Sequence, residues 1–318
     1  MKYSGIGGQA VIEGIMMMKG EDYAVAVRRP DKEIEVKKDT YQSITKKAKI
    51  LQLPFVRGVF RFADSMIIGM RSLTYSASFF EDDEDAEPGK FEQFLDRVFG
   101  EKLESAIMAA VLVISFILAI GIFMLLPLGI ANLFKGVITS DHLMAVLEGV
   151  IRIAIFIIYI KLVSRMEDIR RTFMYHGAEH KCINCVEHGH PLTVKYVRES
   201  SKEHKRCGTS FILIVMVISI LMFMVIRVDT IWMRILSRII LVPVIAGISY
   251  EVLQCAGRSN SKFMDLVSRP GMWMQGLTTK EPDDSMIEVA IAATEAVFDW
   301  RESLTENFPG WEKQLEES

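Results

Sequence analysis

Four long apolar segments dominate the pattern of hydrophobic and polar positions along the chain. Ser105 to Phe134 is thirty residues long without a charged side chain, and Cys207 to Ile226 is a second uncharged segment. Leu143 to Ile160 and Trp232 to Glu251 are similar but carry a few charges. Because about 20 apolar residues are enough for a helix to cross a bilayer, the pattern predicts a mainly α-helical, polytopic membrane protein with four transmembrane helices.

Residues 1–48 predict a small β-containing part that faces water. Tyr23 to Val27 and Glu33 to Lys37 alternate apolar and polar residues on either side of a Pro-Asp-Lys turn, which is typical of a hairpin. The glycine-rich run before it, GIGGQAVIEGIMMM, indicates tight turns. This run lacks the ending of a phosphate-binding loop, so it does not indicate a nucleotide site.

Residues 49–80 predict an amphipathic helix. Phe62, Met66 and Met70 recur at helical spacing, while arginines and Asp64 gather on another face. Such a helix either lies along a membrane surface or packs its apolar face into a core, and both interpretations stay open.

The remaining boundaries follow from charge. Residues 81–104 begin with the run EDDEDAE and predict an acidic linker and pre-membrane segment. The four-span membrane domain then occupies residues 105–255. It includes the His/Cys loop, residues 165–208, between the second and third spans.

Basic residues predict the orientation in the membrane. The loop at 165–206 holds nine lysines and arginines, while the turns at 135–142 and 227–231 hold one each. Positive charges stay on the cytoplasmic side of membrane proteins. We therefore expect a multi-pass protein of the cell membrane. Both termini, the His/Cys loop and the C-terminal helices at 256–318 are expected to be cytoplasmic.

Composition excludes several classes of protein. Half of the residues are hydrophobic, the mean hydropathy is +0.26 and the sequence pI is about 6.1. Nucleic-acid-binding proteins carry a basic face and a high pI, so no nucleic-acid partner is expected. The four cysteines do not form the pattern of a secreted disulfide framework. The lipid bilayer is the expected partner, together with a membrane-protein or lipid-linked partner, and the oligomeric state stays open.

Candidate chemistry is concentrated in the His/Cys loop, which holds five of the six histidines and three of the four cysteines. His176, Glu179 and His180 form an H-x-x-E-H motif. On a helix these three side chains project within one arc of about 100°. The histidines are candidate zinc ligands and Glu179 is a candidate general base. His204 or Cys207, at the start of the third span, would complete the ligand set, and Glu187 and Glu251 are further candidates.

Two other interpretations stay open. Cys182-x2-Cys185 and His204-x2-Cys207 have the spacing of a closed, structural zinc site of the Cys3His type. Alternatively, the loop binds no metal and its histidines are exposed. Gly177, inside the H-x-x-E-H motif, also weakens the helix that the catalytic arrangement requires.

Five segments of the chain resemble the YqhQ-type family of uncharacterised bacterial membrane proteins: GGQAVIEGIMM, YAVAVRRPDKEI, HGAEHK, HKRCGTSF and LTTKEPDDSMIEVAIAA. The family is described as a predicted metal-dependent enzyme. The resemblance implies that Gln9 and Glu13 belong to a signature, for which the sequence suggests no physical reason. It also implies signature positions in and after the H-x-x-E-H motif, at His176, Glu179, His180, Glu187, His204 and Cys207.

Because Cys182 and Cys185 are not typical of that family, the resemblance favours a site built from the two motif histidines and the His204/Cys207 end. We therefore expect a zinc-dependent hydrolase at the cytoplasmic membrane face, acting on a peptide or a lipid-linked molecule. The alternative is a non-enzymatic membrane scaffold or transport-related protein with a structural metal site.

Overall fold

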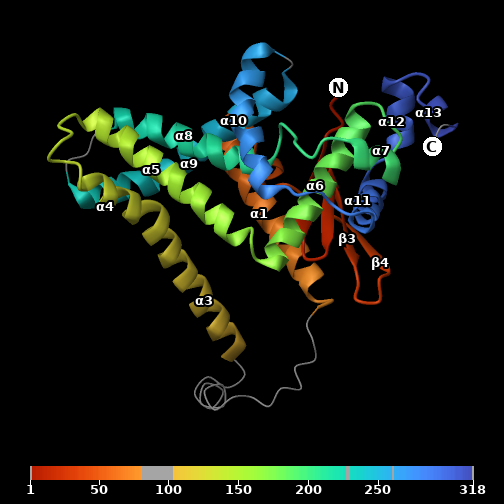
Figure 1. Ribbon diagram of the computed structural model, residues 1–318, viewed down its shortest axis with the longest axis horizontal. Coiled ribbons are helices and arrows are strands. Elements are labelled where there is room, and N and C mark those ends of the chain that lie inside the picture. Colours follow the sequence, from red (N-terminus) through yellow and green to blue (C-terminus); the bar gives the residue numbers. More distant parts are fainter. Residues whose placement is uncertain (1, 81–102, 227–229, 260, 317–318) are drawn as a thin grey trace. The chain divides into compact units, whose positions relative to one another are not determined.

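The computed structural model describes residues 2–80, 103–226, 230–259 and 261–316 (Figure 1). Nearly all of the predicted acidic linker at 81–104 lies outside these residues. The chain divides into two compact units. The first holds residues 1–80, 160–219 and 227–318, and the second holds residues 81–159 and 220–226.

The first unit begins with an antiparallel sheet of four strands in the order β1-β2-β3-β4. The predicted hairpin is confirmed as the pair β3–β4, in which Arg28 lies opposite Ile34. The strand bounds are β1 Ile6–Val11, β2 Gly14–Lys19, β3 Asp22–Arg28 and β4 Ile34–Thr40.

The glycine-rich run contains a tight turn, as predicted, but Gly7, Gly8 and Gly14 lie in strands. These glycines permit close packing. A Cβ atom on Gly8 would lie 2.7 Å from the Met16 carbonyl oxygen and 2.9 Å from Glu179 Cγ. The tight turn is made by Ile12 and Glu13 instead, and Glu13 has a φ of 48°.

Helices cover both faces of the sheet. Ile15 and Met17 belong to one buried cluster with residues of α6, Glu167–Glu187, and α11, Asp284–Val297. Met16 belongs to a second cluster on the opposite face. Because strands buried on both faces need apolar residues at consecutive positions, β2 and β3 read as continuous apolar runs.

The amphipathic helix predicted at 49–80 is confirmed as a helix, α1, Val56–Ala77, which begins after two short 3-10 helices, η1 Ile44–Lys47 and η2 Lys49–Gln52. Its buried positions include Gly58, Ile68 and Gly69. Phe62, Met66 and Met70, the predicted apolar face, are 44%, 55% and 56% exposed. The sheet and α9 therefore contact the small residues of α1 and Ile68, while Phe62, Met66 and Met70 stay largely uncovered.

Asp64 does not lie on an exposed polar face of α1, as the sequence predicted. It is buried, and its carboxylate accepts hydrogen bonds from the Tyr41 hydroxyl at 2.9 Å, the Ser43 hydroxyl at 2.5 Å and the Ile44 amide at 3.0 Å. A buried carboxylate needs such donors. Asp64 therefore fastens the segment that follows β4 to α1.

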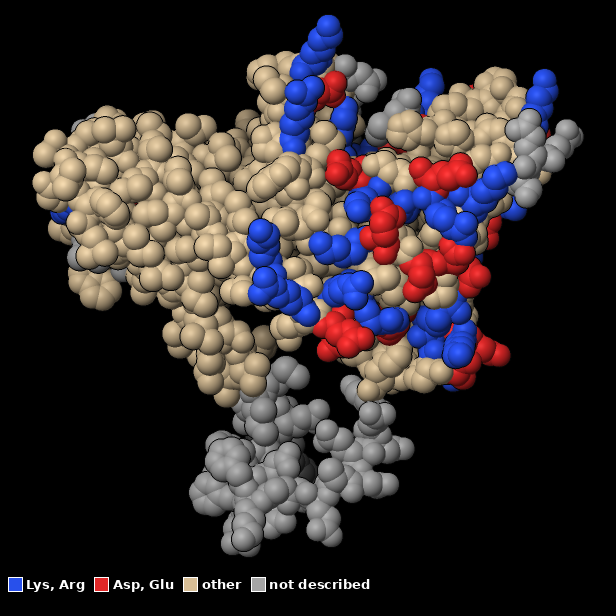
Figure 2. All heavy atoms as spheres, viewed as in Figure 1, with Lys and Arg blue, Asp and Glu red and all other residues tan. Residues whose placement is uncertain are grey.

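Within the described residues, four helices are long and apolar enough to cross a membrane: Ala110–Asn132, Asp141–Val163, Gly208–Val225 and Ile239–Gly257. The chain is thus mainly helical with four candidate membrane spans, consistent with a multi-pass membrane protein. In Figure 2 the surface over α5 is nearly free of charged side chains, while charges gather over the sheet, α6 and α11. The candidate spans lie in the following elements: α3 Leu103–Ile120, the π-helical turn Gly121–Leu125, α4 Leu126–Asn132, α5 Asp141–Val163, α8 Gly208–Val225 and α9 Ile231–Arg258.

Most of the predicted His/Cys loop is helical. Residues of the H-x-x-E-H motif lie in α6, and the rest of the segment contains the short helix α7, Val194–Glu199. The C-terminal region is helical as predicted. It holds α10 Lys262–Thr278, α11, α12 Trp300–Asn307 and α13 Lys313–Glu316.

Candidate metal centre

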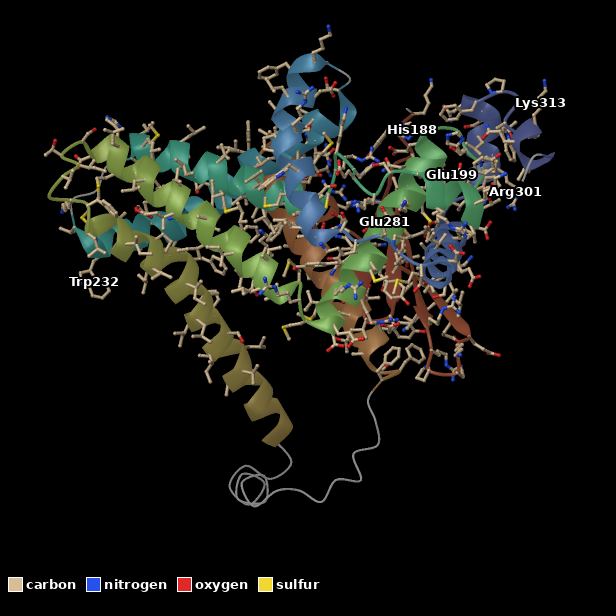
Figure 3. All side chains as sticks on the ribbon, viewed as in Figure 1. His188, Glu199, Trp232, Glu281, Arg301 and Lys313 are labelled. Carbon is tan, nitrogen blue, oxygen red and sulfur yellow. The ribbon has the colours of Figure 1, made fainter. Side chains whose placement is uncertain are left out.

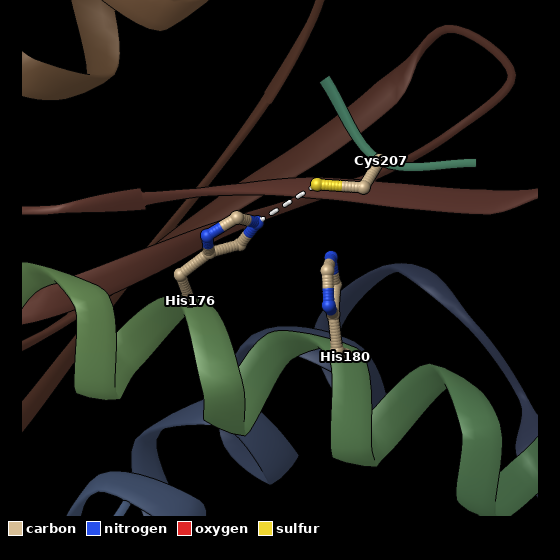
Figure 4. Close-up of side chains that lie close together, drawn as sticks. All are labelled: His176, His180 and Cys207. Atoms are coloured by element: carbon tan, nitrogen blue, oxygen red, sulfur yellow. Dashed lines mark hydrogen bonds between the residues drawn. The ribbon is translucent and has the colours of Figure 1, made fainter. Parts of the chain in front are cut away.

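The structure brings His176, His180 and Cys207 together. The two histidines lie one turn apart on α6, and Cys207 precedes the first residue of α8 (Figure 4). One potential ligand atom from each residue lies within 4.8 Å of the other two. Cys207 Sγ is 3.3 Å from His176 Nε2. Among the described residues, this is the group of three histidine, cysteine or carboxylate side chains that could hold a metal ion.

Hydrogen bonds orient both imidazole rings. His176 Nδ1 lies 2.9 Å from the Thr278 carbonyl oxygen, and His180 Nδ1 lies 2.7 Å from the Lys202 carbonyl oxygen. A carbonyl oxygen only accepts, so each Nδ1 must carry the hydrogen. Each Nε2 then presents a lone pair. Metal-binding histidines are usually held in this way, with the second ring nitrogen donating to a carbonyl or carboxylate.

Glu179 lies beside this group, between α6 and β1. It is only 5% exposed. Burial raises its pKa to about 7, although His176 and the backbone amide of Gly8 favour the charged form. It shares a cavity of about 110 Å3 with the three residues, which is room for roughly three or four waters. The cavity is lined by Ile6, Gly7, Gly8, His176, Glu179, His180, Ile183, His204, Arg206, Cys207 and Gly208.

His204 lines the same cavity but contacts a different partner. Its Nε2 lies 3.4 Å from a carboxylate oxygen of Glu187, and burial lowers its pKa. Burial alone would raise the pKa of Glu187, but hydrogen bonds from His204, Arg206 and the Ser4 amide lower it to about 2. Of the two donors that the sequence proposed for the third ligand position, Cys207 therefore joins the histidine pair. His204 belongs to the neighbouring Glu187 network.

Cys182 and Cys185 face away from Cys207. Both are fully buried in the cluster between α6, the sheet and α11. The Cys185 thiol donates to the Pro191 carbonyl oxygen at 3.3 Å, and burial raises its pKa to about 12. On a helix Cys182 lies about 200° from His180, so the two motifs use opposite faces. The structure therefore contradicts the Cys3His interpretation.

Lys181 and Asn184 hold the segment that supplies the His180 partner, a role that the sequence did not reveal. Lys181 Nζ donates to the carbonyl oxygens of Arg198 at 2.7 Å and Ser200 at 2.9 Å. Asn184 Nδ2 donates to those of Ser201 and Glu203. Lys181 also pairs with Glu281, labelled beside α6 in Figure 3, at 3.1 Å. The only signal in the sequence is that polar residues recur one helical turn apart.

The structure explains why a glycine stands at position 177. A Cβ atom at this position would lie 2.1 Å from the Lys280 carbonyl oxygen. The Lys280 amide donates to the Phe173 carbonyl oxygen at 2.9 Å, so the chain after α10 runs against α6. This close approach places the Thr278 carbonyl under His176. Gly177, which the sequence suggested as a weakness, is therefore needed for the site.

Gln275 positions the segment before Cys207. It is fully buried in α10. Its Oε1 accepts the His204 amide at 2.8 Å, and its Nε2 donates to the His204 carbonyl at 2.7 Å and to the Ser210 hydroxyl at 2.9 Å. Three hydrogen bonds from one side chain thus hold residues on both sides of Cys207.

Glu13 and Gln9, which the sequence left without explanation, fix the sheet to its helices. Both carboxylate oxygens of Glu13 accept from the Arg171 guanidinium at 2.5 Å. Arg171 lies on α6, so this pair holds the β1–β2 turn near the motif. The Gln9 amide fills the space at Gly69, where a Cβ atom would lie 2.3 Å from Gln9 Oε1. Together they place β1, and with it Gly8, against Glu179.

Comparison with known proteins places the chain in a family. A family model described as a protein of unknown function, DUF1385, matches residues 53–300. The "Uncharacterized protein YqhQ" of Bacillus subtilis (strain 168) is 34% identical over 286 residues, which cover 90% of this chain and 89% of that protein. No solved structure matches. The resemblance noted in the sequence is confirmed, and the chain belongs to the DUF1385 family.

Proposed function

We propose that this protein is a metal-dependent hydrolase in which His176, His180 and Cys207 hold a zinc ion. One observation supports this most strongly. Both imidazoles are fixed through Nδ1 to backbone carbonyl oxygens, so that both Nε2 atoms and the Cys207 sulfur converge on one cavity.

The donor set suits zinc. Two imidazoles and one thiolate are common zinc ligands, and catalytic zinc sites keep three protein ligands and an open position. Zinc bonds of 2.0 to 2.3 Å place tetrahedral ligand atoms about 3.3 to 3.6 Å apart. The Cys207–His176 distance of 3.3 Å is close to the value of about 3.5 Å that a nitrogen and a sulfur ligand would have. A bound zinc ion would supply a Lewis acid that polarises a substrate oxygen and acidifies water.

Glu179 is the proposed general base. Its carboxylate lines the cavity and is held by the Gly8 amide, so it is positioned to take a proton from water. In hydrolysis the water oxygen bonds to the acyl or phosphoryl group of the substrate. The proton taken by Glu179 passes to the leaving group. The cavity is small and so holds few waters, which strengthens these electrostatic interactions.

The proposed location is the cytoplasmic face of the cell membrane. The basic residues around α6 support this orientation. The uncovered Phe62, Met66 and Met70 face of α1 supports a helix lying along the membrane surface. Trp232, 81% exposed and pointing outward at the start of α9 (Figure 3), suits the opposite boundary of the bilayer.

Metal content of the purified protein tests the proposal. We expect about one equivalent of zinc in the wild type and almost none in the variant His176→Ala/His180→Ala. His188→Ala is the matched control, because His188 is exposed on the same segment and should leave the metal in place. A wild type that contains no metal after growth in zinc-supplemented medium would overturn the proposal.

The role of Glu179 separates an enzyme from a scaffold. Glu179→Gln should keep the metal but lose hydrolysis of ester, amide or phosphoester probes by about 100- to 10,000-fold. A scaffold with a structural metal would show no hydrolysis in the wild type either. In that case only the His180→Ala variant would change, through loss of stability.

A further inference from the structure

We propose that the substrate is a lipid-linked molecule whose acyl chain occupies a second, apolar cavity between α8, α9 and α10. This inference rests on the proposed hydrolase function and names its substrate class. The cavity has a volume of about 300 Å3, at the lower end of the range typical of ligand-binding pockets.

The lining of this cavity is almost entirely apolar. The one ionisable residue is Lys205, which pairs with Asp265 at 2.6 Å. Lys205 lies just before α8 and Ser210 lies in its first turn. Leu213, Ile214, Val217 and Ile218 follow over about 8 Å of the helix. The rest of the lining comes from Val252, Leu253, Ala256, Val267, Ser268, Pro270 and Gly271.

The two cavities share one wall. Arg206, Cys207 and Gly208 line the metal cavity, while Lys205 and Ser210, on the same short segment, line the apolar one. Gln275 holds this segment in place through Ser210 and His204. The polar end of the apolar cavity therefore lies next to Cys207. An amphiphile with its tail along α8 has its head beside the metal ligands.

The surroundings favour a lipid. Both α8 and α9 contain candidate membrane spans, so acyl chains are the natural neighbours of a cavity between them. The adjoining helix α10 exposes Phe263, Leu266 and Trp273, at 69%, 61% and 63%. Large exposed apolar and aromatic side chains of this kind are typical of helices at a membrane interface.

The metal cavity also has an opening for the head of such a molecule. Cβ atoms on Gly7 and Gly208 would have no neighbouring atom within 4 Å, and both glycines line the metal cavity. The site suits a peptide substrate less well. Peptides often bind by adding a strand to the edge of a sheet, which requires free backbone groups on the edge strand. Here the edge strand β1 already uses the Gly8 amide for Glu179.

Retention of lipid by the purified protein tests the inference. The protein is reconstituted in nanodiscs of dioleoylphosphatidylglycerol, transferred to detergent and examined by native mass spectrometry. We expect one phospholipid to stay bound to the wild type. Val217→Trp fills the cavity and should weaken retention about tenfold or more. Ala256→Ile, a smaller change, should weaken it in the same direction.

Ile212→Trp is the matched control. Ile212 lies on α8 and is 43% exposed, close to the 44% of Val217, but it does not line the cavity. It should retain lipid as the wild type does. No retention by the wild type, or equal retention by both tryptophan variants, would overturn the lipid site. Zinc measured in the same samples should stay near one equivalent. Lipid retained by a metal-free wild type would refute the hydrolase alone.

Discussion

Helices α6 and α8 both supply residues to the site, but they differ in which of their side chains are buried. Helix α6 is rich in charged and polar residues, yet Glu179, Lys181 and Glu187 are buried in it. Helix α8 has no charged residue, yet only Ser210, Met216 and Ser219 are buried. In these two helices, burial therefore does not follow hydrophobicity.

The difference has a physical cause. Each buried polar side chain of α6 has a partner: Lys181 has two backbone carbonyls, and Glu187 has Ser4 and Arg206. Buried polar groups are tolerated only when they are hydrogen-bonded or paired. Helix α8 has the composition of a segment that lipid surrounds, so its apolar side chains do not need protein neighbours. The buried side chains of α6 therefore depend on particular partners, whereas most side chains of α8 need only to be apolar.

The largest expected contrast is between two cysteines. Cys207→Ser should lower the zinc content more than tenfold, because second-row oxygen replaces a strong thiolate ligand. Cys182→Ser, on the core face of α6, should leave the zinc content unchanged. Metal analysis of both variants checks this. Equal loss of zinc in the two would show that α6 does not have separate site and core faces.

Two glycines give the next contrast. Gly177→Ala should cost about 3 kcal/mol, because the new Cβ meets a backbone carbonyl oxygen at 2.1 Å. Gly208→Ala meets open space and should change stability by less than about 0.5 kcal/mol. Thermal unfolding in detergent measures both. An equal melting temperature for the two variants would contradict the close packing inferred for α6.

Acid should destabilise the Glu187 network. The pKa of Glu187 falls from 4.5 to about 2 on folding. Its contribution to stability is therefore fully present above pH 4.5 and is lost as the pH falls toward 2. We expect a loss on the order of 2 kcal/mol across this window. Melting temperatures of wild type and Glu187→Gln between pH 6 and pH 3 check this, and the variant should show a smaller change.

The smallest expected effect is at the Glu13–Arg171 pair, which is partly exposed. A double-mutant cycle with Glu13→Gln and Arg171→Met should show a coupling energy of about 1 kcal/mol. Arg198→Met and Asp284→Asn, at a more exposed pair, are the control and should couple by less than about 0.5 kcal/mol. Thermal unfolding provides the measurement. Coupling of the same size in both cycles would mean that Glu13 does not hold β1 to α6.

Local patterns predicted several elements correctly. The four candidate spans, the β3–β4 hairpin and helix α1 follow from runs and periods that one segment carries by itself. The spacing of His176, Glu179 and His180 also needed only the helical repeat. In contrast, β1 was missed because Gly7 and Gly8 read as turn residues, and only packing against Glu179 explains them.

The sequence by itself determined which segments are apolar enough to enter a bilayer and where metal-binding side chains are concentrated, because both depend on neighbouring residues. Only the tertiary structure decided that Cys207, not His204, joins the two histidines. It also decided that Lys181, Gln275 and Gly177 hold the surrounding chain. Those outcomes depend on contacts between residues far apart in the chain, such as Gln275 with His204, and no periodicity within one segment reports such contacts.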